Sequence, residues 1–269
     1  MFAVESVWRR KMSSFFHRIQ QNKYIFKQLV SRDFKQKYKG TILGIVWSVL
    51  SPLLTFLVMK IVFTDFFGRN TPHYTTYLLA GNIIMAYYRD ATKGGMSSIV
   101  GDASIIRKIN IPKYLFILSK NISLLINLGL SILVFFVFCF FDHISFGWHF
   151  LALIFPIVCI VVMNIGIGMI LSAGYVRFKD VGYLYDVFLR LLHYLSAIFY
   201  QVDRFSPTVQ RLFLLNPVYC IIKYFRTIAI DGNIPSLQYH LLCAFYALFF
   251  FGMGCLIYKK RSKDFIYYL

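Results

Sequence analysis

Ionisable side chains whose spacing could support chemistry are rare in this sequence, and the clearest set lies in one apolar stretch. Asp186 and Arg190 stand four residues apart with His193 one turn further, so a helix would place all three on one face. Ionisable groups inside a membrane are costly and usually face a cavity or each other. The stripe could therefore line a gate, or Asp186 and Arg190 could neutralise each other. The nearby basic loop favours the pair.

The sequence has no signature of a nucleotide-binding or hydrolytic site. It contains no GxxxxGK[ST] phosphate loop, no HExxH and no GxSxG. Its six histidines are scattered, and its five cysteines lie in apolar stretches without a CxxC pair, so we expect no metal site. We therefore predict that the chain is not an enzyme and binds no cofactor.

The composition points to a membrane protein. Of 269 residues, 58% are hydrophobic and 15% are charged, yet the formal net charge is +18. Soluble domains are about 25% charged, and disordered chains lack this many aromatic residues. A nucleic-acid-binding protein would be basic, but would not have so much apolar sequence to bury. We predict one all-α transmembrane domain over 1–269 and no nucleic-acid partner.

Six apolar runs can be interpreted as membrane spans, each of which needs about 20 residues. They are 41–63, 74–91, 114–141, 149–175, 183–201 and 238–258. A further apolar stretch, 207–230, is broken at Asn216-Pro217, and proline divides it into two pieces too short to cross alone. We predict an external re-entrant helical hairpin there, in a six-span bundle over 41–258.

Basic residues give the orientation of this bundle. Of 29 Lys and Arg residues, 21 lie in 1–40, 89–113, 176–182 and 259–269, which six spans place on one side. Both termini are therefore expected in the cytoplasm, with the chain in the cytoplasmic (inner) membrane. Within 1–40, apolar residues at helical spacing alternate with basic ones, which predicts an interfacial helix on anionic lipid. Packing of this helix on a partner protein remains an alternative.

Four motifs follow one another along the chain. Residues 34–52 read FKQKYKGTILGIVWSVLSP, 175–180 read YVRFKD, 195–200 read LSAIFY, and Asn216-Pro217 is followed by Arg226. Their order and the six-span layout closely resemble the membrane subunits of type-2 ABC exporters, which are the permeases for O-antigen, teichoic acid and capsule. The resemblance covers nearly the whole chain.

This resemblance implies a homodimer joined by two copies of a separate cytoplasmic ATPase, which would bind ATP and Mg. The substrate would be a lipid-linked polysaccharide or a polyol-phosphate polymer. Loops 92–113 and 176–182 would contact the ATPase, and 104–109 would form a short amphipathic helix. The expected coupling residues are Ile105, Ile106, Arg107, Lys108, Arg177, Lys179 and Asp180.

Two further sets of residues are candidates for the transport path. A gate or hinge is expected where the in-plane helix turns into the first span, because glycine allows a tight backbone and proline bends a helix. Its residues are Tyr38, Gly44, Trp47 and Pro52. Aromatic rings could stack on sugars, although they also enrich membrane interfaces and helix packing. The channel candidates are Tyr87, Tyr88, Tyr194, Phe199, Tyr200, Tyr219 and Tyr224.

Two other functions stay open. A related permease could export a lipid or a drug, although the sequence has no large external insert. A membrane-embedded glycosyl- or acyltransferase would need acidic or histidine residues clustered at one membrane face, and the sequence has no such cluster. Association with an ATPase subunit would distinguish either transport function from the transferase function.

Overall fold

The computed structural model describes residues 22–37, 39–59, 61–62, 73–109, 111–262 and 264–268, and within these ranges the chain is helical and has no strand. The predicted all-α class is confirmed. After a helix over 22–37, the elements are η1 (Gly44–Val46), α2 (Trp47–Met59), α4 (Tyr74–Gly101), α5 (Ala103–Lys108), α6 (Tyr114–Phe141), η4 (Trp148–Leu153), α7 (Ile154–Tyr175), α8 (Asp180–Leu195), η5 (Val202–Arg204), α9 (Pro207–Phe213), α10 (Pro217–Ala229), α11 (Leu237–Arg261) and α12 (Phe265–Tyr268).

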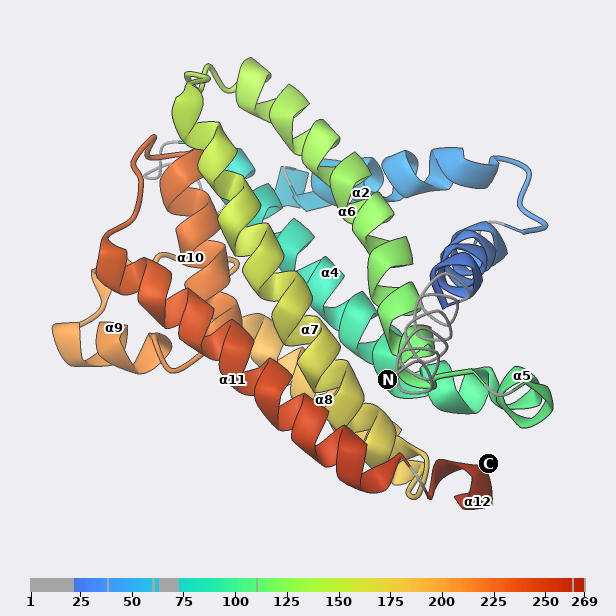
Figure 1. Ribbon diagram of the computed structural model, residues 1–269. Coiled ribbons are helices and arrows are strands. Elements are labelled where there is room, and N and C mark those ends of the chain that lie inside the picture. The colour runs from blue at the N-terminus through green and yellow to red at the C-terminus, as the bar shows by residue number, and fades with distance from the viewer. Residues whose placement is uncertain are drawn as a thin grey trace, which may run out of the picture.

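Helix α4 occupies the centre of the bundle. It packs against α6, α7 and α10 (Figure 1), and it buries side chains along its whole length. Asn82, Arg89 and Asp90 make this 28-residue helix too polar to count as a span by hydropathy. Because other helices cover most of its surface, α4 does not need the apolar exterior that a lipid-exposed helix requires.

Glycine pairs allow α4, α7 and α11 to pack closely. A Cβ atom at Gly95 of α4 would lie 3.0 Å from the Cα atom of Gly168 in α7. On the other side of α7, a Cβ atom at Gly254 of α11 would lie 2.7 Å from the Cα atom of Gly166. Small residues let membrane helices approach until their backbones touch. Gly166 and Gly168 thus place α7 tightly between its two neighbours.

Three described helices are long and apolar enough to cross a membrane: α6, the continuous η4–α7 helix and α11. The α9–α10 pair would make a fourth if it is counted as one broken span. Helices α2 and α8 contain 13 and 16 residues, which is short of the ~20 that a span needs. The described helices therefore establish a multi-pass protein and leave the count of six as a prediction.

The predicted break at Asn216-Pro217 separates α9 from α10, whose axes meet at 105°. The Asn216 side chain caps α10 by accepting hydrogen bonds from the backbone N–H groups of Val218 (3.0 Å) and Tyr219 (3.2 Å). Its amide nitrogen donates to the Leu195 carbonyl oxygen at 3.1 Å. A single side chain therefore begins α10 and fastens it to the end of α8.

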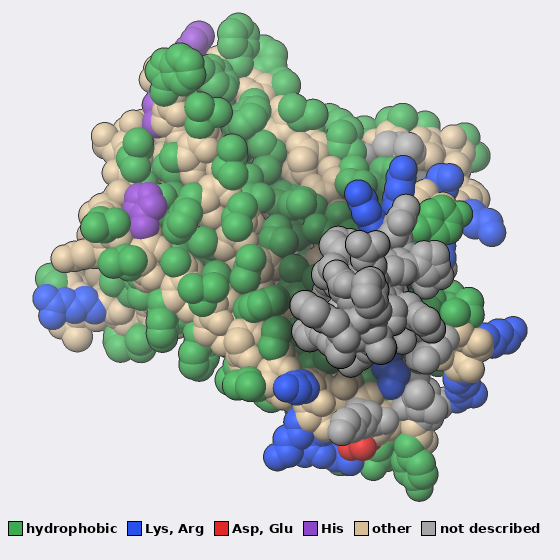
Figure 2. Space-filling model, in the orientation of Figure 1, with side chains coloured by type: hydrophobic (Ala, Val, Ile, Leu, Met, Phe, Trp, Pro, Cys, Tyr) green, Lys and Arg blue, Asp and Glu red, His purple; other side chains and the backbone are tan. Residues whose placement is uncertain are grey.

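The bundle has two ends of different character (Figure 1). The basic end carries the helix over 22–37, α5, the 176–179 turn and residues 259–262 and 264–268. The opposite end carries the 142–147 turn and the segments 196–206 and 230–236. Figure 2 shows apolar side chains over most of the visible face, with Lys and Arg gathered mainly along its lower and right edges.

Candidate functional site

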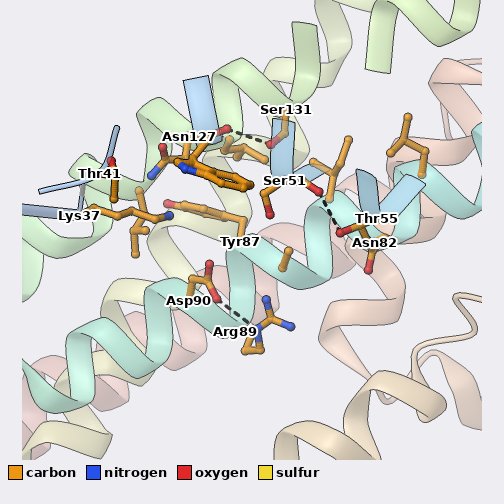
Figure 3. Close-up of a pocket in the computed structure, with 16 residues that line it drawn as sticks. Lys37, Thr41, Ser51, Thr55, Asn82, Tyr87, Arg89, Asp90, Asn127 and Ser131 are labelled. Atoms are coloured by element: carbon orange, nitrogen blue, oxygen red, sulfur yellow. Dashed lines mark hydrogen bonds and ion pairs between the residues drawn. The ribbon is translucent and has the colours of Figure 1, made fainter. Parts of the chain in front are cut away.

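A cavity of about 630 Å³ lies between α2, α4 and α6 (Figure 3). Helix α4 contributes Tyr87, Asn82 and the adjacent ion pair of Arg89 and Asp90. The residues that line it are Lys37, Thr41, Trp47, Ser51, Thr55, Leu79, Asn82, Ile83, Ala86, Tyr87, Arg89, Asp90, Leu124, Asn127, Leu128 and Ser131. The cavity is thus lined by both polar and apolar side chains, although the helices around it are mainly apolar.

Hydroxyl and amide groups inside this cavity are partly satisfied by their own helices. Thr55 donates a hydrogen bond to the Ser51 carbonyl oxygen at 2.9 Å, and Ser131 donates to the Asn127 carbonyl oxygen at 3.0 Å. Such intrahelical bonds lower the cost of placing hydroxyl groups in an apolar bundle.

A buried ionic junction joins the helix over 22–37 to the bundle. The Asp33 side chain is 1% exposed and accepts hydrogen bonds from Lys120 Nζ (2.8 Å), Ser119 Oγ (2.8 Å) and Arg32 Nη2 (2.7 Å). A buried carboxylate is tolerated when cations and hydrogen-bond donors surround it in this way. Asp33 therefore attaches this helix to α6.

Arg32 extends the junction to the start of α5. Its Nη1 atom lies 2.9 Å from a carboxylate oxygen of Asp102, the residue immediately before α5. Burial lowers the pKa of Arg32, but hydrogen bonds and the charges of Asp33 and Asp102 outweigh it, so the pKa is raised. The 22–37 helix is thus connected by side chains to the segment expected to contact an ATPase.

The predicted short helix over 104–109 is present as α5. Ile106 is buried beneath it, whereas Arg107 and Lys108 are exposed. Arg177, in the 176–179 turn, donates to the Tyr268 hydroxyl at 3.1 Å. Burial lowers the pKa of Lys179, which lies over the Tyr175 ring, while Asp180 begins α8. The remaining predicted coupling residue, Ile105, is partly buried.

The C-terminal segment also packs on the basic end. Lys113 Nζ donates a hydrogen bond to the Ser262 carbonyl oxygen at 2.7 Å, and burial lowers the Lys113 pKa. Phe265 is buried against Tyr258, with ring centroids 5.3 Å apart. Residues 264–268 therefore cover part of the surface beside the 176–179 turn.

The predicted channel aromatics do not form one lining. Tyr87 faces the large cavity, whereas Tyr88 is buried in the core. Tyr224 is also in the core, with its hydroxyl 2.5 Å from His240 Nε2. Two other groups lie toward the opposite end: Tyr194 and Phe199 near His193, and Tyr200 and Tyr219 around Phe213. A substrate contact stays a prediction for each of the seven.

The predicted hinge is described in part. Gly44 has φ +50°, a left-handed conformation that favours glycine, and η1 begins there. Trp47 begins α2 and lines the large cavity, and Pro52 lies within α2. Tyr38 lies outside the described residues. The structure thus places the turn where the sequence predicted one, and it leaves gate motion as a prediction.

The favoured pairing of Asp186 with Arg190 is wrong. Asp186 Oδ1 instead lies 2.7 Å from Lys93 Nζ of α4. Arg190 is exposed on another part of α8. Spacing of four residues allows a pair on one helix, but a lysine from a neighbouring helix competes for the same carboxylate.

Sequence reasoning missed Asp33, Asn82 and Asn127. Asp33 carried a usable signal, because it is the one acidic residue within 22–37 of the sequence. An isolated acid in a basic amphipathic helix indicates a specific partner. Asn82 also interrupts an apolar run, but only the fold places it opposite Asn127 of α6.

Comparison with known proteins agrees with this architecture. Residues 24–230 match the ABC-2 type transporter family. The chain therefore belongs to the ABC-2 type transporter membrane family.

Curated relatives match over nearly their full length. The chain is 23% identical to the O-antigen export system permease protein RfbA of Myxococcus xanthus, covering 88% of this chain and 92% of that protein. It is 25% identical to a Klebsiella pneumoniae protein of the same name, over 90% and 95% of the two chains. It is 21% identical to the capsule polysaccharide export inner-membrane protein CtrC of Neisseria meningitidis, over 93% and 96%.

Proposed function

We propose that this chain is the permease subunit of an ATP-driven exporter that moves a lipid-linked polysaccharide across the cytoplasmic membrane. The observation that carries the proposal is the family match over 24–230, since the full-length relatives are named for O-antigen and capsule export. The sequence contains no phosphate-binding loop. A separate ATPase therefore binds ATP and Mg, and the chain itself catalyses no covalent step.

In this proposal the bundle has six spans with both termini in the cytoplasm. The proposal counts the apolar runs 41–63 and 183–201, which overlap the short helices α2 and α8, as two of these spans. The 22–37 helix lies in the headgroup plane, and α9–α10 re-enter the membrane from outside. The basic end supports this orientation, because positively charged segments remain cytoplasmic.

A homodimer encloses the transport path in this proposal. Exposed apolar residues on α2 and α8 suit contact with lipid or with a second copy, and the proposal assigns part of this surface to the second copy. On α8 they include Leu184, Val187 and Leu191. The large polar cavity beside α2 would then open toward the path between the two copies.

Two copies of the ATPase dock on the basic end. Arg107 and Lys108 project from α5, and Phe178 is exposed in the 176–179 turn. Exposed basic and apolar side chains on neighbouring segments fit an acidic groove with an apolar floor. The Asp33 junction would then pass movement of the ATPase contact to the 22–37 helix and α6.

Co-purification tests this proposal. The wild-type chain is expected to retain the ATPase encoded beside it, and lipid-linked glycan should stimulate ATP hydrolysis by the complex. Arg107→Glu should weaken retention because it reverses a charge on α5. Arg211→Glu makes the same change on exposed α9 and serves as the matched control. Wild-type chain that binds no ATPase would overturn the proposal, and transferase activity of the isolated chain would favour the enzyme alternative.

A further inference from the structure

A second, smaller cavity of about 150 Å³ lies at the opposite end of the bundle. It lies between the start of α4, the 201–203 segment and α10. Its lining includes the Tyr77 and Tyr219 side chains together with Gln201, Asp203, Lys223 and Asp231. It is therefore separate from the large cavity beside α2, and its lining combines aromatic and hydrogen-bonding groups.

A buried guanidinium group makes one wall of this cavity rigid. Arg226 donates hydrogen bonds to the carbonyl oxygens of Tyr77 (3.1 Å), Ala197 (2.9 Å) and Ile198 (3.1 Å). Its Cζ atom lies 3.4 Å from the centroid of the Tyr77 ring. Gly81 leaves the space that Arg226 occupies, because a Cβ atom there would collide with the guanidinium. The wall is thus formed before any ligand arrives.

The rim offers unused hydrogen-bonding groups. Asp203 Oδ1 and Lys223 Nζ are 3.7 Å apart, which is too long for a direct hydrogen bond. Within the described part of the chain, no side-chain hydrogen bond joins Gln201 or Asp231 to another residue. Thr227 adds a hydroxyl group to the lining. Donors and acceptors of both kinds therefore remain available to water or a ligand.

This combination selects among ligand classes. The carboxylates of Asp203 and Asp231 would repel a phosphate, and the N–H groups of Arg226 already donate to three backbone carbonyl oxygens. The positive charges of Lys223 and Arg226 would repel a metal ion, which also needs more ligands than two carboxylates supply. A neutral polyhydroxylated ring fits best, because each hydroxyl both donates and accepts, and aromatic rings cover its apolar face. The volume is below the ~300 Å³ of a drug-sized site, so it suits one ring.

We propose that this cavity binds a single sugar unit of the exported polymer at the exit side of the permease. The inference rests on the proposed function for its substrate and for the orientation of the opposite end. Asp203, Lys223, Gln201 and Asp231 bind the ring hydroxyls, and Tyr219 packs on the ring. A rigid site for one unit would hold the emerging chain while the next unit moves forward.

Saturation-transfer NMR on the full-length permease in nanodiscs tests binding. The probes are the methyl glycosides of glucose, galactose, mannose, rhamnose and N-acetylglucosamine, each measured separately. At least one should receive saturation, and Gln201→Ala should weaken its binding about fivefold, as expected for one hydrogen bond. Gln238→Ala, at an exposed position on α11, is the matched control and should leave binding unchanged.

Three outcomes would overturn the inference. One is that no glycoside binds, another is that Gln201→Ala and Gln238→Ala behave alike, and the third is that inorganic phosphate or calcium binds at this site instead. Polymer export measured in cells that carry Gln201→Ala distinguishes a site for a unit of the polymer from a site for a free sugar. Only a site for a polymer unit predicts slower export. ATPase co-purification should stay normal in this variant. Loss of sugar binding with normal ATPase co-purification would therefore be distinguished from failure of the proposed function, in which the ATPase does not bind.

Discussion

The two ends of the molecule each bury an ionisable side chain, and they stabilise it differently. At the basic end, Asp33 is surrounded by the side chains of Arg32, Lys120 and Ser119. At the opposite end, Arg226 donates only to backbone carbonyls in the described structure and lies on the Tyr77 ring. The Asp33 arrangement joins charged side chains of separate helices, whereas the Arg226 arrangement joins a side chain to backbone carbonyl groups.

This difference indicates which end can move. Side-chain ion pairs can separate when water can solvate the released cations, and Arg32 and Lys120 are 30% and 26% exposed, although the Asp33 side chain is only 1% exposed. Ala197 and Ile198, which supply two of the three carbonyl oxygens bound to Arg226, are fully buried, so separation there would leave buried polar groups without this donor. We infer a separable connection at the basic end and a permanent one at the opposite end.

Arg226→Ala should have the largest effect. It removes a donor from three carbonyl oxygens, of which that of Ala197 keeps a 3.4 Å hydrogen bond from the Tyr77 hydroxyl, and each buried group left without a partner costs about 1–3 kcal/mol. That sum is a large fraction of a typical stability of 5–15 kcal/mol. Thermal stability in detergent, followed by size-exclusion chromatography, should show little folded protein. Arg226→Lys retains the charge and should recover part of the stability; an Ala variant as stable as wild type would contradict a permanent connection.

Asp33→Asn should have a smaller and local effect. The change removes the counter-charge of Lys120 and one of the two carboxylates that pair with Arg32, at a cost of about 1.5–3 kcal/mol for hydrogen bonds to a charged group. The 22–37 helix can then detach without unfolding the bundle. Hydrogen exchange measured by mass spectrometry should rise in 22–37 and stay unchanged in 114–141. Asp90→Asn, in a half-exposed pair, is the control, and equal exchange in both variants would refute a separable junction.

Much of this architecture was predictable from the sequence because it follows from local patterns. Apolar length predicted α6, α7 and α11, and Pro217 predicted the break before α10. The partners of Asp33 and Asp186 were not predictable, because Lys120 and Lys93 lie 87 and 93 residues away along the chain. The cavity beside α2 was also hidden, since its lining comes from three helices and spacing along one helix shows only one wall.

Asp102→Asn should weaken the junction less than Asp33→Asn does. It removes the Arg32–Asp102 pair but leaves Asp33 bound to Lys120 and Ser119. A partly exposed pair of this kind contributes about 0.5–1.5 kcal/mol and is screened by salt. Exchange in 22–37 should therefore rise slightly at low salt, and the difference from wild type should shrink at high salt. A salt-independent rise in exchange as large as that of Asp33→Asn would instead make Asp102 the main residue that holds the 22–37 helix.

Asp186→Asn should have the smallest effect, although the Lys93–Asp186 distance of 2.7 Å is as short as any in the Asp33 junction. Both side chains are more than 40% exposed, so water replaces most of what the pair loses. Exposed pairs contribute about 0–1 kcal/mol. The thermal unfolding temperature should change by less in Asp186→Asn than in Asp102→Asn. A double-mutant cycle with Lys93→Met should give a coupling energy near zero. A large coupling would mean that distance, rather than burial, sets the strength of these ion pairs, and the contrast between the two ends would then lose its physical basis.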